Sequence, residues 1–393
     1  MRTNLVGALE TMLKLQRWNS LPRLETWVEA ENAAYVTHVG YALGRQMGLS
    51  SAQLRCLLMR SLLKSLNKHI LTDVPVPMRE RLNAQTNGAI WRQFVNDSAA
   101  ETSRLFPRLI AEEIGRYLTD APSYSVEGVD ENDAGARARV EGLIEYARAK
   151  VAVAECQVNE KIFEKDYAET RSRLEERIKK ISGHEEYDRC FNALLSYLAP
   201  IRQMKYLRRW NRVNRNVPTS VLGHTYVVSV VAISFCLLRE TRDKLAGIGD
   251  DFAEQVMLRA LFHDVPEGLT GDLIAPVKKR LAAINTDAWA ELEAGVLRDF
   301  VKTAPEGVRE DMKAYRLLKN LSLERPYSID SLVKDSDILA AVAECLYEKQ
   351  CGNIDAEMAS AYESYSLELR RSEWSCVRDL RDVVSAEWEA LRS

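Results

Sequence analysis

Two histidines and two aspartates form the set of side chains with the clearest chemical potential in this sequence. His224 lies just before an apolar run, TYVVSVVAISFCLL, and Asp337 is expected to open a helix in VKDSDILAAVAEC. His263 and Asp264 end a third apolar run, VMLRALFHD. Neutral imidazoles and carboxylates together bind borderline divalent cations, and four such ligands leave positions open for water and a substrate oxygen. A cation held in this way makes water nucleophilic near neutral pH, so these residues are candidate ligands of a catalytic metal ion.

Each of these positions also has an ordinary structural explanation. An HD dipeptide is common, and a single histidine at a helix end is more often a hydrogen-bonded core residue than a ligand. The surrounding sequence is more specific, in three stretches: RRWNRVNRNVPTSVLGH (208–224), LFHDVPEGLTGDLIAPVKK (261–279) and VKDSDILAA (333–341). Across roughly residues 205–350, these stretches resemble the YfbR-like 5′-deoxynucleotidase branch of the HD-domain superfamily of metal-dependent phosphohydrolases.

The resemblance implies one divalent metal ion per chain (Mn, Co, Zn, Fe or Mg), held by His224, His263, Asp264 and Asp337. Glu267 matches the family glutamate that assists the attacking water, and with Asp264 it forms the expected catalytic pair. A carboxylate beside an activated water can serve as general base or orient that water. Aspartates beside histidines can also fix the tautomer of the ring.

The same resemblance implies the contacts to the substrate. Arg209 and Trp210 match the pair that lines the phosphate and base side of the pocket. Asp272 matches the aspartate placed for the sugar 3′-hydroxyl. Lys278 matches a basic position of less defined role, whereas Lys279 is more simply a residue on a solvated helix face.

Two residues need comment because they affect how the ligands are supported. Gly223 stands where the family usually has an acidic residue before the first histidine, so the support of His224 is expected to differ. Pro266 follows the HD pair, and because proline interrupts a helix or begins a new one, it predicts a break at this point.

The expected reaction is hydrolysis of a nucleoside 5′-monophosphate, in particular a deoxynucleotide, to nucleoside and phosphate. One alternative keeps the HD chemistry but changes the substrate to a dNTP, a cyclic nucleotide or an alarmone. Another is a non-catalytic nucleotide-sensing or adaptor protein. The TGDLIAPVK stretch matches the monophosphatase branch best, and the intact ligand set argues against a non-catalytic role.

The elements that position these residues are predicted to be helices. Apolar residues recur at helical spacing along most of the chain, alternating patterns are nearly absent, and Gly and Pro are few, at 18 and 11 of 393 residues. This pattern predicts an all-α fold, and with the family resemblance it predicts tandem HD-domain helical repeats in a pseudo-dimeric arrangement.

An internal repeat underlies that expectation. Three pairs of segments match in the same order: LQRWNSLPR (15–23) with LRRWNRVNR (207–215), LLKSLNKHILTDVPVPMRERL (62–82) with LFHDVPEGLTGDLIAPVKKRL (261–281), and AVAEC at both 152–156 and 341–345. Shared helix composition explains apolar matches but not an identical pentapeptide. Duplication therefore explains the three matches better.

The first copy has lost the metal ligands. In the alignment of the two copies, His224 falls on Asn32, His263–Asp264 on Lys64–Ser65, Glu267 on Lys68 and Asp337 on Arg148. His38 and His69 fall on no ligand position, and we expect His38 to pack in the core and His69 to lie in a loop or at a helix end. Cationic side chains in place of ligands could balance the charge of such a pocket without a metal.

Three domains follow from the repeat: residues 1–156 as a degenerate HD-like domain, 157–204 as a helical connector, and 205–393 as the catalytic HD domain with C-terminal helices. The silent copy could be a covalently attached pseudo-partner or a scaffold. A third interpretation makes the pocket of Lys64 and Arg148 a regulatory site for an anionic nucleotide. The first two are favoured, and further self-association of the chain is left open.

Composition limits the partners and the location. A formal charge of −3 and a pI of about 6.1 make long nucleic acid a poor partner, although a local basic pocket for one phosphate is compatible with them. The seven cysteines include no CxxC pair, which is typical of reduced thiols in a cytosolic protein. No signal peptide is recognisable, and the longest apolar run is too short to cross a membrane. We therefore expect a cytoplasmic protein that does not bind membranes.

Overall fold

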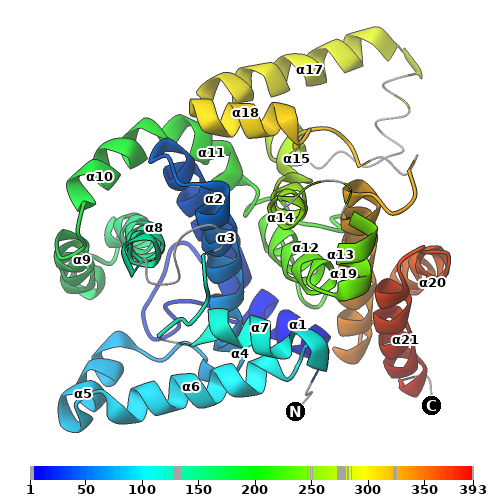
Figure 1. Ribbon diagram of the computed structural model, residues 1–393. Coiled ribbons are helices and arrows are strands. Elements are labelled where there is room, and N and C mark those ends of the chain that lie inside the picture. Colours follow the sequence, from blue (N-terminus) through cyan, green and yellow to red (C-terminus); the bar gives the residue numbers. More distant parts are fainter. Residues whose placement is uncertain are drawn as a thin grey trace.

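The computed structural model describes residues 4–119, 121–126, 134–245, 247, 249, 251–271, 280, 283–284, 286–321 and 325–391. Over these residues the regular elements are helices (Figure 1), and strand-like pairing is confined to two isolated bridges, Gln16 with Val28 and Arg208 with Ser220. The all-α fold predicted from the helical spacing is confirmed.

The first half of the chain and the segment after it form eleven helices within the described residues: α1 (Leu5–Lys14), α2 (Glu29–Gln46), α3 (Ser51–Leu66), α4 (Lys68–Leu71), α5 (Val76–Thr86), α6 (Ala89–Ser103), α7 (Arg108–Leu118), α8 (Ala134–Glu160), α9 (Glu164–Lys179), α10 (His184–Ala193) and α11 (Leu195–Gln203). Ser50 and Gln53 exchange side-chain to backbone hydrogen bonds and so fix the start of α3. The domain boundary expected after residue 156 falls inside α8. The break in helical structure comes later, at residues 161–163.

The second half contributes α12 (Val221–Cys236), α13 (Arg239–Leu245), α14 (Phe252–Phe262), α15 (Val265–Thr270), α17 (Thr286–Thr303), α18 (Glu306–Ala314), α19 (Ile329–Gln350), α20 (Ala356–Arg370) and α21 (Ser375–Ala390). The expectation that Asp337 opens its helix is wrong. Ser328 accepts a hydrogen bond from the Ser331 amide at 3.1 Å and caps α19, so Asp337 lies about two turns inside it.

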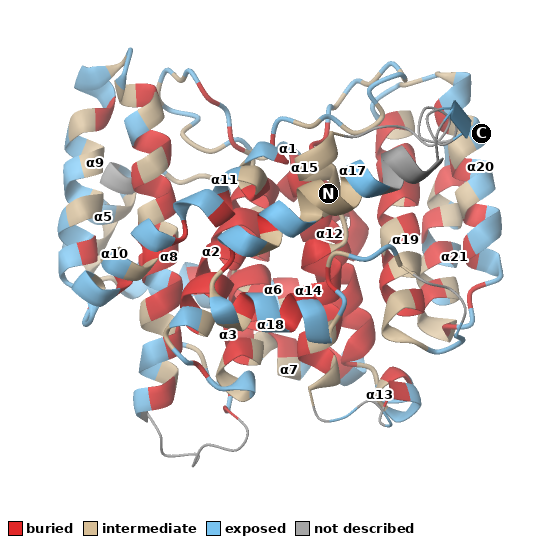
Figure 2. Ribbon diagram, turned by 90° about the horizontal axis from the view of Figure 1, so that it is seen from above, coloured by how far each residue is buried: buried red, intermediate tan, exposed pale blue. Residues whose placement is uncertain are grey.

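Helices from both halves share the centre of the molecule. α2 packs against α12, and α3 packs against α14, so buried residues gather around these four helices (Figure 2). Every residue of α12 is buried, because a helix that is apolar all round is covered on all sides.

Among the described residues no single helix is long and apolar enough to cross a membrane. Only α12 and α13 together meet length and composition limits, and they are bent by 87°.

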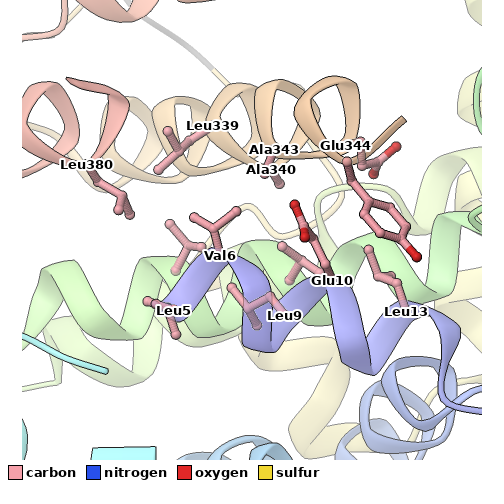
Figure 3. Close-up of a pocket in the computed structure, with 13 residues that line it drawn as sticks. Leu5, Val6, Leu9, Glu10, Leu13, Leu339, Ala340, Ala343, Glu344 and Leu380 are labelled. Atoms are coloured by element: carbon pink, nitrogen blue, oxygen red, sulfur yellow. The ribbon is translucent and has the colours of Figure 1, made fainter. Parts of the chain in front are cut away.

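Two helices, α1 and α11, pack against helices of both halves of the chain. α1 packs on α12 and α19 as well as on α2, and α11 packs on α2 and α15. Leu5 of α1 and Leu339 of α19 face one another across an apolar seam, with Glu10 and Glu344 farther along it (Figure 3). The space within the seam is about 20 Å³, room for about one water molecule. It belongs to the packing between the halves and is too small for a substrate.

The two first-half histidines have structural roles. His38 is fully buried on α2, and its ring lies 5.0 Å from that of Phe262 on α14, edge to face. Burial lowers the pKa of His38 to about 3, so the ring is neutral in the folded protein at neutral pH. His69 lies on the short helix α4, with Nε2 at 3.2 Å from the Thr102 hydroxyl. His38 therefore packs in the core, as predicted.

Glu254 is a buried carboxyl of α14 at the contact with α3, and we expect its ionisation to make the free energy of unfolding depend on pH. This carboxyl is 2% exposed and accepts a hydrogen bond from the Ser51 hydroxyl at 2.6 Å. Burial is the main cause that raises its pKa to about 7, and Asp311 and Asp251 act in the same direction while Ser51 and Arg45 oppose them. The folded state thus keeps a proton between about pH 4.5 and 7 that the unfolded chain loses, so this contribution to stability decreases as pH rises through that range.

We expect Glu254→Gln to match the wild type at pH 5 and to be more stable by about 2 kcal/mol at pH 8, because glutamine keeps the Ser51 hydrogen bond without a charge to bury. Urea unfolding of both proteins at the two pH values measures the difference. Parallel pH dependence of wild type and variant would show that Glu254 is not the titrating group.

Candidate metal centre

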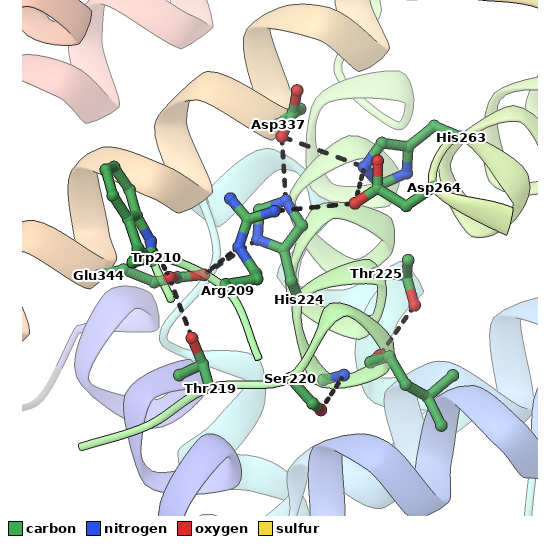
Figure 4. A network of polar contacts seen from close by, with 12 residues as sticks. Arg209, Trp210, Thr219, Ser220, His224, Thr225, His263, Asp264, Asp337 and Glu344 are labelled. Atoms are coloured by element: carbon green, nitrogen blue, oxygen red, sulfur yellow. Dashed lines mark hydrogen bonds and ion pairs between the residues drawn. The ribbon is translucent and has the colours of Figure 1, made fainter. Parts of the chain in front are cut away.

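The four predicted metal ligands converge from three places in the second half (Figure 4). His224 Nε2 lies 2.9 Å from Asp337 Oδ1. His263 Nε2 lies 3.2 Å from Asp264 Oδ2 and 4.0 Å from Asp337 Oδ1. One ligand atom from each of His224, His263 and Asp264 can be chosen so that all lie within 4.8 Å of one another. These separations bring all four side chains within reach of one cation.

Local sequence explains how the ligands are placed. Ser220 caps α12 by accepting a hydrogen bond from the Gly223 amide at 3.1 Å, which puts His224 in the first turn of that helix. α14 ends at His263, and α15 begins at Val265 with Pro266 in its first turn. Proline is favoured at a helix start because its missing N–H would be unpaired there. The break predicted at Pro266 is therefore present, and it leaves Asp264 at the junction.

Hydrogen bonds fix both imidazole rings. His263 Nδ1 donates to the Ala260 carbonyl at 2.6 Å, which leaves its Nε2 facing Asp264. His224 Nδ1 lies 3.0 Å from Glu344 Oε1, which likewise leaves Nε2 facing Asp337. The buried His263 Nε2 and Asp264 Oδ2 make no hydrogen bond. Imidazole nitrogens and carboxylate oxygens that converge in this way are the donor set of a divalent cation, whose binding displaces the ring protons between them, so the residues fit a metal ion.

Charge is concentrated at this site. Burial would raise the pKa of Asp337, but the hydrogen bond to His224 and the charge of Lys334 hold it well below its usual range. Burial lowers the pKa of His263, yet the carboxylates of Asp264 and Asp337 outweigh burial and raise that pKa to about 9. The aspartates are therefore ionised at neutral pH, which is the state that ligates a metal.

Glu344 organises the contacts behind the ligands, and the sequence analysis did not identify it. Its Oε1 faces His224 Nδ1, while its Oε2 accepts hydrogen bonds from Trp210 Nε1 at 2.7 Å, Thr219 Oγ1 at 3.1 Å and Arg215 Nη1 at 3.2 Å. Burial opposes ionisation of Glu344, but Arg209 and these partners lower its pKa below the usual range. The carboxylate therefore fixes the tautomer of a predicted ligand.

Arg209 and Trp210 both reach this network. Arg209 Nε lies 3.3 Å from Glu344 Oε1, and its Nη1 lies 3.7 Å from Asp264 Oδ2. Trp210 commits its indole N–H to Glu344 and packs edge to face on Tyr365, with ring centroids 6.1 Å apart. Arg209 thus bridges a ligand and its support, whereas the polar atom of Trp210 is already used in holding the network.

Comparison with known proteins places this half of the chain. Residues 196–387 match the model of the 5′-deoxynucleotidase YfbR-like family. A 5′-deoxynucleotidase of Pectobacterium atrosepticum is 29% identical over 180 residues, 45% of this chain and 84% of the relative. The 5′-deoxynucleotidase YfbR of Shigella flexneri is 32% identical over the same shares of both chains. This chain belongs to the YfbR-like family. A solved Pyrococcus horikoshii protein shares 20% identity over 49% of this chain and 99% of its own, with a TM-score of 0.35.

Other residues of the family motif lie beside the centre or outside the described residues. Glu267 lies on α15, where its amide donates to the Asp264 carbonyl at 3.0 Å and its charge acts on Arg209. Asp272 and Lys278 lie outside the described residues, as does Lys279. Of the two carboxylates expected on the substrate side, Glu267 and Asp272, only Glu267 lies within the described residues.

Two further charged residues lie close to Asp337 on α19. Lys334 Nζ donates to Asp337 Oδ2 at 2.9 Å. The spacing of lysine three residues before aspartate on one helix was the available signal, because such residues are neighbours on a helix surface. Asp335 instead accepts a hydrogen bond from the Ser372 hydroxyl, away from the ligands.

Gly223, which departs from the YfbR-like pattern, lies at the contact between the halves. A Cβ at Gly223 would lie 3.2 Å from Leu13 and 3.7 Å from Glu31, both in the first half. Glu31 occupies the position that the repeat aligns with Gly223, and its carboxylate accepts a hydrogen bond from the Ser220 hydroxyl at 2.7 Å. An acidic side chain from the other half thus lies where the family has one before the histidine.

A similar frame exists in the first half, outside the residues that match the family model. Trp18 and Trp210 both have a φ of 56°, a left-handed conformation uncommon for a bulky residue. The indole of Trp18 donates to Glu155, as that of Trp210 donates to Glu344. The two isolated bridges flank these tryptophans at positions 192 residues apart. The bridges and tryptophans of the two halves are thus 192 residues apart, like the RWN matches, and the two glutamates lie at the same position of the two AVAEC segments.

The aligned ligand positions also lie together in the first half. Asn32, aligned with His224, donates from Nδ2 to Glu155 Oε1 at 2.8 Å. The residues aligned with the other ligands and with Glu267 line the same cavity as Asn32: Lys64, Ser65, Arg148 and Lys68. Among the described residues, the one group of close His, Cys, Asp and Glu atoms able to hold a metal is His224, His263 and Asp264.

Proposed function

We propose that this chain is a metal-dependent phosphohydrolase that converts nucleoside 5′-monophosphates, in particular deoxynucleotides, to nucleoside and phosphate. The convergence of His224, His263, Asp264 and Asp337 on one point, in a member of the YfbR-like family, carries the proposal. Relatives named 5′-deoxynucleotidase support the choice of substrate. A divalent cation (Mn, Co, Zn, Fe or Mg) held there supplies Lewis acidity, which lowers the pKa of a water and offsets phosphoryl charge.

The protein's own residues would perform the remaining tasks. Glu267 accepts the proton of the attacking water as the water oxygen bonds to phosphorus. The bond from phosphorus to the nucleoside 5′-oxygen breaks, and that oxygen takes up the proton from Glu267 or from solvent to leave as a hydroxyl. Arg209, 3.7 Å from Asp264 through Nη1, binds a phosphate oxygen and so aligns the phosphoryl group with that water. From the family motif, Asp272 binds the sugar 3′-hydroxyl, Lys278 contacts the substrate, and Trp210 bounds the pocket.

We also propose that the first half is a degenerate copy of the second and serves as its attached partner. Supporting observations are the paired roles of Glu155 and Glu344, and the packing of α2 on α12 and of α3 on α14. The domains would then be the first copy up to the break at residues 161–163, a helical connector to residue 204, and the catalytic domain from 205 onward.

Phosphate release from a nucleotide panel tests the function directly. Protein loaded in turn with Mn²⁺, Co²⁺ or Mg²⁺ is expected to release phosphate from dAMP and other nucleoside monophosphates faster than from dATP, cyclic AMP or a guanosine tetraphosphate. Preference for one of the last three would transfer the same chemistry to that substrate. No release from any of them by metal-loaded protein would contradict an enzymatic role.

A further inference from the structure

The first half contains a cavity of about 340 Å³ at the place where the second half has its metal centre. Pockets of roughly 300 Å³ and above accommodate small ligands. The lining comes from α2, α3, α4, α5, α6, α8 and α9, from the segment of Arg17 and Trp18, and from the segment between α4 and α5. Its size and origin therefore permit a ligand as large as a nucleotide.

The most telling residue of this cavity is Arg148. Among the described residues its one recorded hydrogen bond is a long one, 3.4 Å, to the Ser65 hydroxyl, and it forms no recorded ion pair. The nearby Arg60, by contrast, has its charge paired with Glu141 at 3.0 Å. Burial and the charge of Arg60 lower the pKa of Arg148 to about 10, although the charges of Glu141 and Glu29 oppose them. Because buried charges in proteins are normally paired, an anion in the cavity would give Arg148 the direct partner that it lacks.

Other cations around the cavity share too few carboxylates. Arg17 Nη1 lies 3.2 Å from Glu29, and Lys68 pairs with the same carboxylate. The one charge of Glu29 therefore serves two cations, although Arg17 has a second partner in Glu155 at 3.0 Å. Asp73 also lines the cavity, and its charge acts on both Arg17 and Lys68. With Lys64 also in the lining, the cavity is electropositive.

The comparison with the metal centre suggests what this charge recognises. In the alignment of the two halves, Lys64 corresponds to His263 and Arg148 to Asp337. The first half therefore has cationic side chains at two positions where the second half has predicted metal ligands. A phosphate that needs a bridging cation in the second half would meet cationic side chains directly here. Trp18 and Trp91 also line the cavity and offer aromatic faces for a base.

We propose that the first-half cavity binds a nucleotide through its phosphate, without a metal ion, and that Arg148 is the principal contact. Ser65 and Lys68 complete the phosphate site. This inference does not rest on catalysis in the second half, because the residues that carry it belong to the other copy.

Binding of dAMP and of inorganic phosphate to metal-free protein, by calorimetry at fixed ionic strength, tests the proposal. We expect dAMP to bind more tightly than phosphate and Arg148→Gln to weaken dAMP binding about tenfold or more. Arg173→Gln removes a charge from the exposed face of α9 and should leave binding unchanged. Arg209→Gln distinguishes the two halves, because binding that depended on Arg209 would take place in the second-half site.

The melting temperature of the ligand-free variants separates a ligand contact from a structural role. Arg148→Gln should melt above the wild type without ligand and gain less from added dAMP. A structural arginine would instead lower the melting temperature when replaced. The proposal is overturned if dAMP does not bind, if Arg209→Gln rather than Arg148→Gln abolishes binding, or if Arg148→Gln and Arg173→Gln weaken it equally. Equal affinity for phosphate and dAMP would overturn the assignment to a nucleotide.

Discussion

Asp264→Ala is expected to lose its metal and to release phosphate from dAMP about a thousandfold more slowly than the wild type, a barrier increase of ~4 kcal/mol. Asp264 Oδ2 is buried, makes no hydrogen bond and lies 3.2 Å from His263 Nε2, so alanine removes a ligand that no neighbour replaces. Metal content after dialysis and kcat/KM measure the two losses.

The first half supplies a matched control for this variant. Ser65 stands at the position aligned with Asp264, so Ser65→Ala should retain both metal and activity. Folding should survive in Asp264→Ala, because Arg209 keeps its contact with Glu344 at 3.3 Å. Full activity of Asp264→Ala with an unchanged metal content would remove the centre from the mechanism.

Glu344→Gln is expected to lower metal affinity about 10- to 100-fold, although Glu344 would not itself touch the metal. A glutamine amide no longer holds the Nδ1 proton of His224 with a negative charge, so the tautomer that leaves Nε2 free is less favoured. Arg209 and Arg215 also lose a shared counter-charge, and breaking such buried pairs costs about 3 kcal/mol of unfolding free energy. Chelator competition and urea unfolding measure the two effects.

Glu155→Gln separates these two effects. Glu155 accepts from Arg17 Nε at 3.0 Å and from Asn32 at 2.8 Å, in the frame that corresponds to that of Glu344. Its replacement should lower stability while leaving metal affinity unchanged. If both variants weakened metal binding alike, the loss in Glu344→Gln would be a general effect of destabilisation.

The sequence was sufficient for the helical class, which depends on apolar spacing, and its short motifs singled out four side chains that the fold brings together. It was not sufficient for Glu344, which reads as one polar residue within the apolar pentapeptide AVAEC. Its role depends on a contact with His224, 120 residues earlier in the chain, and such a pairing exists only in the fold. The verbatim copy of that pentapeptide around Glu155 was the available signal.

Helix boundaries were predicted less well, for local reasons. Asp337 was expected to open its helix. The capping hydrogen bond of Ser328 lies earlier, and the helix runs through Asp337 without interruption. Similarly, the change to charged composition after residue 156 suggested a new element, although α8 continues to Glu160. Composition reports exposure, which changes along one continuous helix.

The contact between Glu31 and Gly223 has a consequence for how such a chain can change over generations. In a dimer of identical subunits, every substitution near the two-fold axis appears on both sides at once, so an acidic residue there would face its own copy. Here the aligned positions belong to one polypeptide, and one carries a carboxylate while the other has no side chain. The duplication proposed above would thus free each side of the contact to mutate alone, which is the condition under which one copy can lose its ligands while the other keeps them.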